Sequence, residues 1–227
     1  FPPRWNREPR SGIEVPLRFG KTIEYRDSRV VGDVKFLWEI NRHLQLVTLA
    51  QAWRLTGDER YARGCSDWLQ SWFDQCPYPL GINWTSSLEA AFRLVNWSAA
   101  WHLLGGAASP LFRGEEGVAF WQARLRSIRQ HCHFVAGHLS LHSSANNHLL
   151  GELLGLYAGS TTWPLWSESA RWREQARTMR LLAVVAVFAI LGLLSPVFAR
   201  YVREIVEAVG GGQLGGMIPA PSIRDAV

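Results

Sequence analysis

The sequence predicts an all-α fold built from consecutive antiparallel helical hairpins. Apolar residues recur at three- and four-residue steps from residue 33 to about residue 178, which is the period of amphipathic helices. Short loops rich in glycine and proline separate these segments, and strand-like alternation is confined to residues 1–32. Such hairpins stack into an open solenoid or close into a toroid, and their periodicity does not distinguish the two.

Residues 1–32 are predicted to form an extended N-terminal segment. They hold four of the eleven prolines, and residues 13–19 read as a short strand interrupted by Pro16. We therefore expect strand and loop that cover a helical domain at residues 33–178.

The first predicted helix runs from Asp33 to Gly57, which supplies its C-terminal stop. Asp58 then caps a second helix, which ends at the loop that contains Pro77 and Pro79. The apolar positions that define these two helices are Leu37, Ile40, Leu44, Val47, Trp53, Tyr61, Cys65, Trp68, Leu69 and Trp72.

Four more helices are predicted. The third begins near Ser86, where Ser86 and Glu89 have the spacing of a capping box. The fourth runs from about residue 116 to a histidine-rich region, the fifth covers about 145–157, and the sixth covers 167–180. The apolar face expected for the third helix comprises Leu88, Ala91, Phe92, Val95 and Ala99.

The segment 139–148 brings polar side chains to the expected start of the fifth helix. Asn146, Asn147 and His148 stand where a polar run gives way to an apolar pattern. Free N–H groups and the helix dipole favour an anion at such a position. Taken alone, Asn146 is better interpreted as an N-cap and His148 as a surface histidine. Three further motifs precede them in order: Trp-Glu-Ile-Asn-Arg-His at 38–43, Gly-Ile-Asn-Trp at 81–84 and Ser-Leu-Glu-Ala-Ala-Phe-Arg at 87–93.

Together these four motifs resemble the heparinase II/III and alginate lyase families, over residues 1 to about 178. The resemblance implies an incomplete (α/α) toroid that is followed by a β-sandwich domain. It also implies a polysaccharide lyase that cleaves anionic glycans containing uronic acid, heparin-like, heparan-like or alginate-like, by β-elimination. A periplasmic or cell-envelope location follows from such a substrate.

The resemblance assigns catalytic roles to Asn147 and His148. Removal of the C5 proton beside a carboxylate builds up negative charge, which hydrogen-bond donors must neutralise. The resemblance gives this role to Asn147, and to His148 either neutralisation or proton abstraction. The residues expected to bind substrate are Asn41, Arg42, Asn83, Trp84, Arg93, His142 and Asn146.

Different contacts are expected from these binding residues. Arg42 or Arg93 would hold a carboxylate or sulfate, and Trp84 would stack on a sugar ring. For Asn41 and Arg42, hydrogen bonding between helices inside the barrel is an equal alternative. For Glu89, helix capping is favoured over a catalytic role.

A catalytic tyrosine is the missing part of the resemblance. The family uses a Tyr from further along the helical domain, and often a His from the β-domain. Tyr201 is the only tyrosine after Tyr157, and its neighbours belong to a different kind of segment. We therefore expect no lyase turnover from the chain as it stands. The alternative function is a non-catalytic helical glycan-binding or scaffold module tethered to a membrane.

The composition favours an acidic partner. The formal net charge is +5, and only Lys21 and Lys35 are lysines, so arginine supplies most of the cations. No basic block interleaved with aromatics stands in residues 1–178, so we expect an anionic polysaccharide and no nucleic acid. His138 and His142 have a metal-binding step without an acidic third ligand, and three cysteines fit neither a disulfide framework nor a zinc site. No metal or cofactor is expected.

Residues 179–227 differ from the rest. Leu181 to Ala199 form an uncharged stretch long enough to span a bilayer, which predicts a transmembrane helix. The residues that follow resemble the start of an ABC-2 type transporter permease. The arginines before the stretch would place the N-terminal side in the cytoplasm, which conflicts with a lyase that meets extracellular glycan. We therefore hypothesise a chimera that joins two coding segments near residues 176–181.

Overall fold

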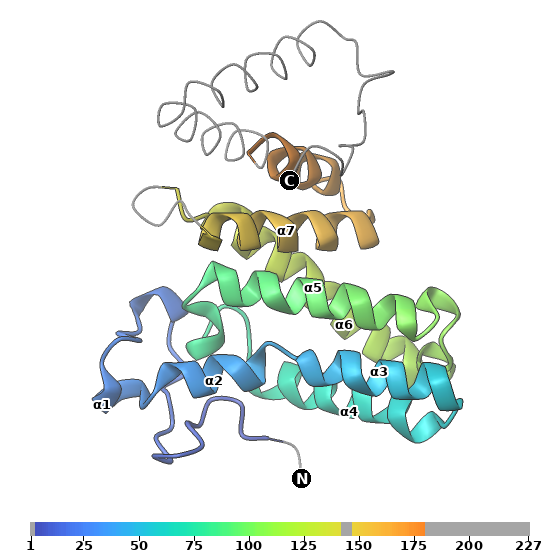
Figure 1. Ribbon diagram of the computed structural model, residues 1–227, viewed down its shortest axis with the longest axis horizontal. Coiled ribbons are helices and arrows are strands. Elements are labelled where there is room, and N and C mark those ends of the chain that lie inside the picture. Colours follow the sequence, from blue (N-terminus) through green and yellow to red (C-terminus); the bar gives the residue numbers. More distant parts are fainter. Residues whose placement is uncertain (1–2, 142–146, 180–227) are drawn as a thin grey trace, which may run out of the picture. The chain divides into compact units, whose positions relative to one another are not determined.

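The computed structural model describes residues 3–141 and 147–179, and within these ranges it contains helices and no β-strand (Figure 1). This confirms the all-α prediction. The helices are α1 (Ser28–Val31), α2 (Val34–Asn41), α3 (Leu44–Thr56), α4 (Glu59–Gln75), α5 (Ser87–Leu103), α6 (Gly114–Gly137) and α7 (Asn147–Thr162), with short 3-10 turns at η1 (Gly20–Thr22), η2 (Ile82–Trp84), η3 (Gly106–Ala108) and η4 (Pro110–Phe112). Residues 169–179 are also helical.

The chain divides into two units, residues 1–179 and 180–227, and only the first is described here. The predicted transmembrane helix at 181–199 and the permease-like tail lie outside the described residues. Within the described ranges, no helix has the length and apolar character needed to cross a membrane.

The α3–α4 hairpin forms as predicted. Gly57 ends α3 with φ of 70°, a left-handed conformation that glycine adopts without steric penalty. The carboxylate of Asp58 accepts a hydrogen bond from the backbone N–H of Arg60 and so caps α4. Both signals are local, and both were readable in the sequence.

The helix predicted from Asp33 to Gly57 is instead two helices, α2 and α3, separated at His43. His43 has φ of 64° and is the only non-glycine residue with positive φ in the described ranges. His43 is 1% exposed, and its Nδ1 accepts a hydrogen bond of 2.9 Å from the indole Nε1–H of Trp97. This core contact overrides a helical periodicity that continues through the break.

The start and the buried face of α5 also differ from the prediction. Ser86 is the N-cap residue, but its side chain makes no capping hydrogen bond, and Glu89 pairs with Arg42 instead. The predicted capping box is therefore wrong. The predicted face is also largely wrong, because Phe92 is 37% exposed. The side chains that α5 buries are Ser87, Glu89, Ala90, Ala91, Arg93, Leu94, Trp97, Ser98 and Ala100.

The N-terminal segment covers the helices without forming a strand. Its bridges are isolated pairs, Arg7 with Glu14 and Phe19 with Leu80. Trp5 is fully buried, and its indole N–H donates a hydrogen bond of 3.1 Å to the hydroxyl of Ser71 on α4. The segment was predicted to be extended, but it contains η1 and α1, and the predicted strand is absent from the described part.

Helix α7 packs closely on α5 through glycines spaced four residues apart. A Cβ on Gly151 would lie 2.6 Å from Leu88, and one on Gly155 would lie 2.5 Å from the Cα of Ala91. A Cβ on Gly159 would lie 2.9 Å from the Sγ of Cys132 on α6 and 3.0 Å from Leu94 on α5. Figure 1 shows α7 running along α5, an arrangement that fixes the start of α7 beside the start of α5.

Candidate functional site

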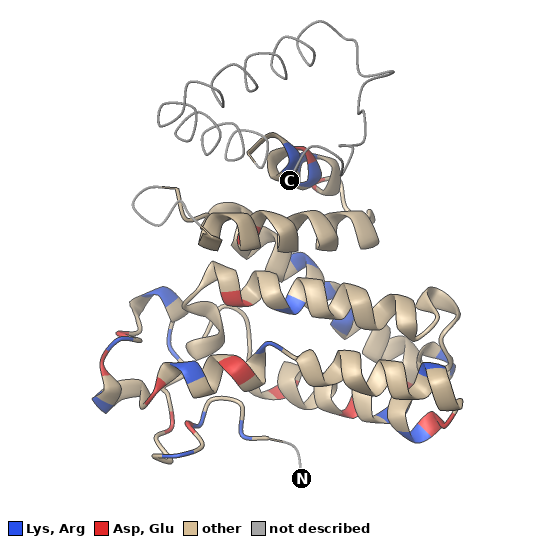
Figure 2. Cartoon of the chain, in the orientation of Figure 1, with Lys and Arg blue, Asp and Glu red and all other residues tan. Residues whose placement is uncertain are grey.

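A cleft of about 490 Å³ lies where the N-terminal segment and α2 face the first residues of α5, the residue that follows α6 and the first turns of α7. It brings together two residues from separate predicted motifs, Arg42 and His148. Basic positions along the N-terminal segment and the start of α2 are visible in Figure 2. The cationic and imidazole side chains that line the cleft are Lys21, Arg26, Lys35, Arg42, His138 and His148.

Arg42 is held in a fixed geometry at the cleft. Its Nε and one terminal nitrogen donate hydrogen bonds of 2.8 and 2.9 Å to the two carboxylate oxygens of Glu89. Its other terminal nitrogen donates to Glu39 at 2.8 Å. These bonds, led by the one to Glu89, raise the pKa of Arg42. The Glu89 side chain is only 3% exposed, and both Glu89 and Arg42 line the cleft.

The cleft holds three further cations, Lys21, Arg26 and Lys35, and the buried carboxylate of Glu152 acts electrostatically on Lys21. None of the three makes an ion pair with a described residue, whereas the charge of Arg42 is offset by Glu39 and Glu89. Lys21 donates a hydrogen bond of 3.1 Å to the carbonyl of Thr85, and burial lowers its pKa. These residues were not predicted as site residues, although both lysines of the chain are among them.

The two histidines in the cleft come from the ends of two helices. His148 is exposed on the first turn of α7, as the sequence predicts. His138 follows α6, and its Nδ1 lies 2.8 Å from the carbonyl oxygen of Phe134. A carbonyl only accepts, so Nδ1 carries the proton and Nε2 of the neutral ring keeps a lone pair. His138 lines the cleft, and in its neutral form Nε2 is the ring nitrogen that can accept a proton.

Asn147 is exposed as the first residue of α7, beside His148, and it does not line the cleft among the described residues. His142 and Asn146 lie outside the described residues. The predicted catalytic pair thus occupies the expected helix start.

Glu152 is a cleft residue that the sequence reasoning missed. Its side chain is buried, and one carboxylate oxygen accepts hydrogen bonds of 2.7 and 2.8 Å from the hydroxyls of Ser87 and Ser140. The other oxygen accepts the backbone N–H of Ser140 at 2.7 Å. Glu152 is the only formally charged residue in α7 and lies one turn after His148, which was a readable signal.

Four predicted binding residues lie in the core and not in the cleft. Arg93 is fully buried, and it donates to His131 Nε2 at 2.8 Å and to the carbonyl of Asn83 at 2.7 Å. Burial lowers its pKa to about 10. Trp84 is also fully buried, and its ring lies 4.6 Å from that of His131. Neither side chain can contact a glycan in this structure.

Asn41 and Asn83 have structural roles for the same reason. The amide of Asn41 donates to the carbonyls of Trp5 and Leu37 and accepts from Trp72 Nε1 at 2.9 Å. The bond to Trp72 on α4 is of the kind expected by the alternative, hydrogen bonding between helices. Asn83 is fully buried beside the thiol of Cys76.

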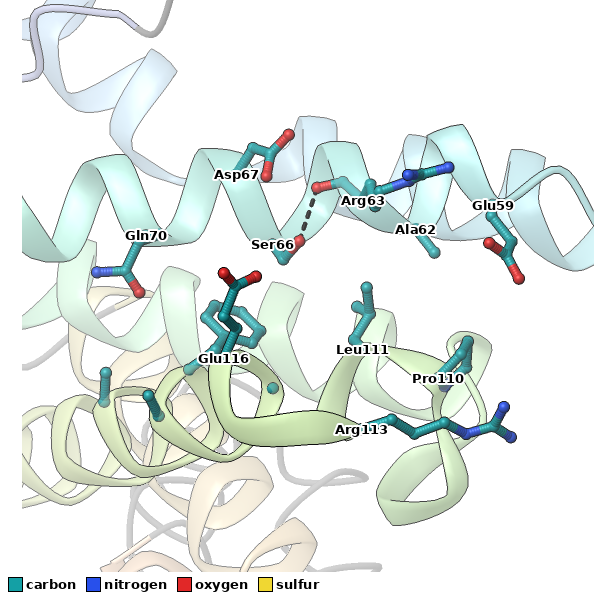
Figure 3. Close-up of a pocket in the computed structure, with 14 residues that line it drawn as sticks. Glu59, Ala62, Arg63, Ser66, Asp67, Gln70, Pro110, Leu111, Arg113 and Glu116 are labelled. Atoms are coloured by element: carbon teal, nitrogen blue, oxygen red, sulfur yellow. Dashed lines mark hydrogen bonds between the residues drawn. The ribbon is translucent and has the colours of Figure 1, made fainter.

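A larger cavity of about 660 Å³ lies between α4 and the segment formed by η4 and the start of α6. Figure 3 shows Glu59, Arg63 and Asp67 on α4 opposite Glu116 and Arg113. Three carboxylates against two arginines suit an anionic ligand less well than the cleft does, and no predicted site residue lines this cavity.

In the described ranges, no three histidine, cysteine or acidic side chains gather at metal-binding geometry. The three cysteines are free and buried, and burial raises the pKa of each thiol to about 12. They are Cys65, Cys76 and Cys132.

Comparisons with known proteins agree with the fold and the motifs. A family model described as Heparinase II/III N-terminus matches residues 10–185. A heparin-sulfate lyase of Bacteroides stercoris is 25% identical over 183 residues, which covers 72% of this chain and 26% of that protein. The crystal structure of a mutant of the heparan sulfate lyase HepC from Pedobacter heparinus has a TM-score of 0.56 at 24% identity, covering 76% of this chain and 25% of that chain.

The likeness to the crystal structure concerns the fold, and it supports the helical toroid rather than an open solenoid. The chain spans about a quarter of the length of the relatives it matches.

Proposed function

This chain belongs to the heparinase II/III N-terminus family, and from that premise we propose that it is the glycan-binding helical part of a polysaccharide lyase. The proposed substrates are anionic glycans that contain uronic acid, and the proposed reaction is β-elimination. Such an enzyme would work in the periplasm or the cell envelope, where these polymers are met.

One observation carries the proposal. A single cleft holds His148 from the predicted catalytic segment, Arg42 from the first motif, and Lys21 without an ion-pair partner in the described part. A glycan carboxylate needs cations and hydrogen-bond donors that are already in place when charge develops. Glu89 holds Arg42 in a fixed position, so a contact with Arg42 would cost little side-chain freedom, while Lys21 is a cation of the cleft that no ion pair with a described residue holds.

Specific roles follow for the side chains around the cleft. His148 would help to neutralise the carboxylate of the uronate whose C5 proton is removed. The family resemblance implies the same role for Asn147, which lies beside His148 but does not line the cleft. The C5 proton passes to a basic group, and the electron pair forms a C4–C5 double bond. The C4–O bond breaks, and the departing oxygen takes up a proton from a general acid or from water. His138 is a candidate acceptor because its Nε2 has a lone pair in the neutral ring.

Binding of defined oligosaccharides tests the proposal. Isothermal titration calorimetry would compare heparan sulfate and alginate tetrasaccharides on the full chain and on Lys21→Gln. We expect about tenfold weaker binding in the variant, since one charge-assisted contact is lost. Arg63→Gln is the matched control, because Arg63 is an exposed arginine that lines the other cavity. Equal losses in both variants, or no binding by the parent chain, would refute the proposal.

Ultraviolet absorbance of the unsaturated product separates the two candidate functions. Binding without product over long incubation supports the alternative, a non-catalytic glycan-binding module. Product formation that disappears in Asn147→Ala and His148→Ala supports the lyase and overturns our expectation of no turnover.

A further inference from the structure

A cavity of about 440 Å³ adjoins the cleft on the side of the N-terminal segment. Four residues line both volumes and so form a wall that the two cavities share: Tyr25, Arg26, Lys35 and Trp38. None of them was predicted as a site residue.

Two aromatic rings in this wall are held in place by packing. Tyr25 and Trp38 lie with their ring centroids 5.4 Å apart at an angle of 46°, and both side chains are partly exposed. Beneath them lies a small apolar cluster that fixes their positions: Val15, Ile23, Val31, Leu37 and Ile82. Aromatic rings held in this way present an apolar face with a polar edge, which suits the C–H face of a sugar.

Two cations flank these rings without a carboxylate partner in the described part. The guanidinium of Arg26 lies 5.6 Å from the centre of the Tyr25 ring, and Lys35 is exposed at the start of α2. Neither takes part in an ion pair, whereas the neighbouring Arg29 is paired with Asp27 at 2.7 Å.

Asp33 is the only carboxylate among the residues that line the adjoining cavity. One of its oxygens accepts the backbone N–H of Lys35 at 3.1 Å and caps α2. Its carboxylate makes no ion pair with Arg26 or Lys35 in the described part, so both cations can still pair with a ligand.

We propose that Tyr25, Arg26, Lys35 and Trp38 form a second sugar subsite that holds a neighbouring acidic sugar of the same glycan. The sugar ring packs on the two aromatic rings, and its carboxylate or sulfo group pairs with Arg26 and Lys35. The subsite rests on the proposed function, because the first sugar lies in the cleft. Its consequence is a preference for chains longer than one disaccharide.

Chain length provides the first test. Calorimetry on the full chain would compare a heparan sulfate tetrasaccharide with the corresponding disaccharide, in the parent and in Arg26→Gln and Lys35→Gln. Each variant should weaken tetrasaccharide binding about fivefold, as expected for one charge-assisted contact, and should weaken disaccharide binding by a clearly smaller factor, because Arg26 and Lys35 also line the edge of the cleft. Arg63→Gln again serves as control. Equal weakening for both ligands, or none for the tetrasaccharide, overturns the subsite.

The small number of lysines provides a second, direct readout. Reductive methylation with carbon-13 formaldehyde keeps the charge and labels Lys21 and Lys35, the only two lysines in the chain, together with the terminal amine. The Lys35→Gln variant assigns the signals. The tetrasaccharide should shift both lysine signals, and the disaccharide should shift the Lys21 signal more than the Lys35 signal.

The outcomes separate the two proposals. If the tetrasaccharide shifts only the Lys21 signal, the proposed glycan site in the cleft stands and the proposed second subsite is refuted. If neither lysine signal shifts in the parent chain, the proposed function is refuted as well. Repeating the titration with an alginate tetrasaccharide, which has carboxylates and no sulfo groups, tells which acidic group the subsite holds.

Discussion

The carboxylate of Glu152 on α7 accepts a hydrogen bond of 2.7 Å from the hydroxyl of Ser87, the first residue of α5. The same carboxylate accepts two hydrogen bonds from Ser140, so it joins three segments that meet at the cleft. Because His148 lies one turn before Glu152 on α7, the position of His148 depends on this junction.

Glu152→Ala should therefore destabilise the fold by about 1–3 kcal/mol, since a buried hydrogen-bonded group is lost and its donors are left unpaired. Urea unfolding monitored by circular dichroism measures the change. Glu24→Ala is the control, since Glu24 is exposed, and it should stay within about 0.5 kcal/mol of the parent. A Glu152→Ala protein as stable as this control would show that the junction is dispensable.

The glycines of α7 give a second prediction. Gly155→Ala places a methyl group 2.5 Å from the Cα of Ala91, so α7 must move away from α5. Overpacking of this kind costs about 1–3 kcal/mol. In Gly137→Ala, at the end of α6, the added methyl meets nothing within 4 Å. That control should be neutral or slightly stabilised, because alanine favours helix. Thermal unfolding of the pair checks the contrast, and similar melting temperatures contradict it.

Arg42 gives a third prediction because its two carboxylate partners differ in burial. The Glu89 side chain is 3% exposed and that of Glu39 is 67% exposed. Glu89→Gln should destabilise by about 1–3 kcal/mol, below the full cost of breaking a buried pair because Arg42 can turn toward solvent. Glu39→Gln should change stability by less than about 0.5 kcal/mol. Chemical denaturation of both variants tests the ranking, which fails if Glu39→Gln is the more destabilised.

Two buried histidines predict how stability depends on pH. Burial holds the pKa of His43 and of His131 well below the ordinary value of about 6.5. The unfolded chain therefore takes up protons below about pH 6.5 that the folded chain does not, so stability is full above that pH and falls as the pH falls below it.

Unfolding free energies measured between pH 7 and pH 5 check this dependence. The loss approaches about 1.4 kcal/mol per histidine for each pH unit below 6.5. The exposed His133 provides the control, since His133→Gln should leave the slope unchanged. The pKa values of Asp27 and Glu168 are lowered to about 2, so their contribution to stability changes only at lower pH. A flat profile between pH 7 and pH 5 would contradict the prediction.

Local patterns predicted the helices, and long-range contacts decided where local patterns failed. The stop at Gly57 and the cap at Asp58 depend on neighbours in sequence, and both were found. The break at His43 depends on Trp97, 54 positions away. The side chain of Glu89 pairs with Arg42, 47 positions away, instead of capping its helix. No periodicity within one helix contains that information.

The sequence predicted only those residues of the candidate site that belong to a recognisable motif. Arg42 and His148 were identified from their motifs and meet in one cleft. The same motifs also named Trp84 and Arg93, whose burial depends on the packing of helices around them. Lys21 and Glu152 were missed because their position at the cleft follows from the meeting of the N-terminal segment with α5 and α7.

The three thiols offer a means of following how this fold opens. Cys65 lies in α4, Cys76 follows α4 and Cys132 lies in α6, and each is buried with its pKa raised to about 12. A thiol in that state does not react with an alkylating reagent until the surrounding helices separate. The rate at which each cysteine is labelled, located by mass spectrometry, would therefore time the separation of its own helix from the rest of the domain.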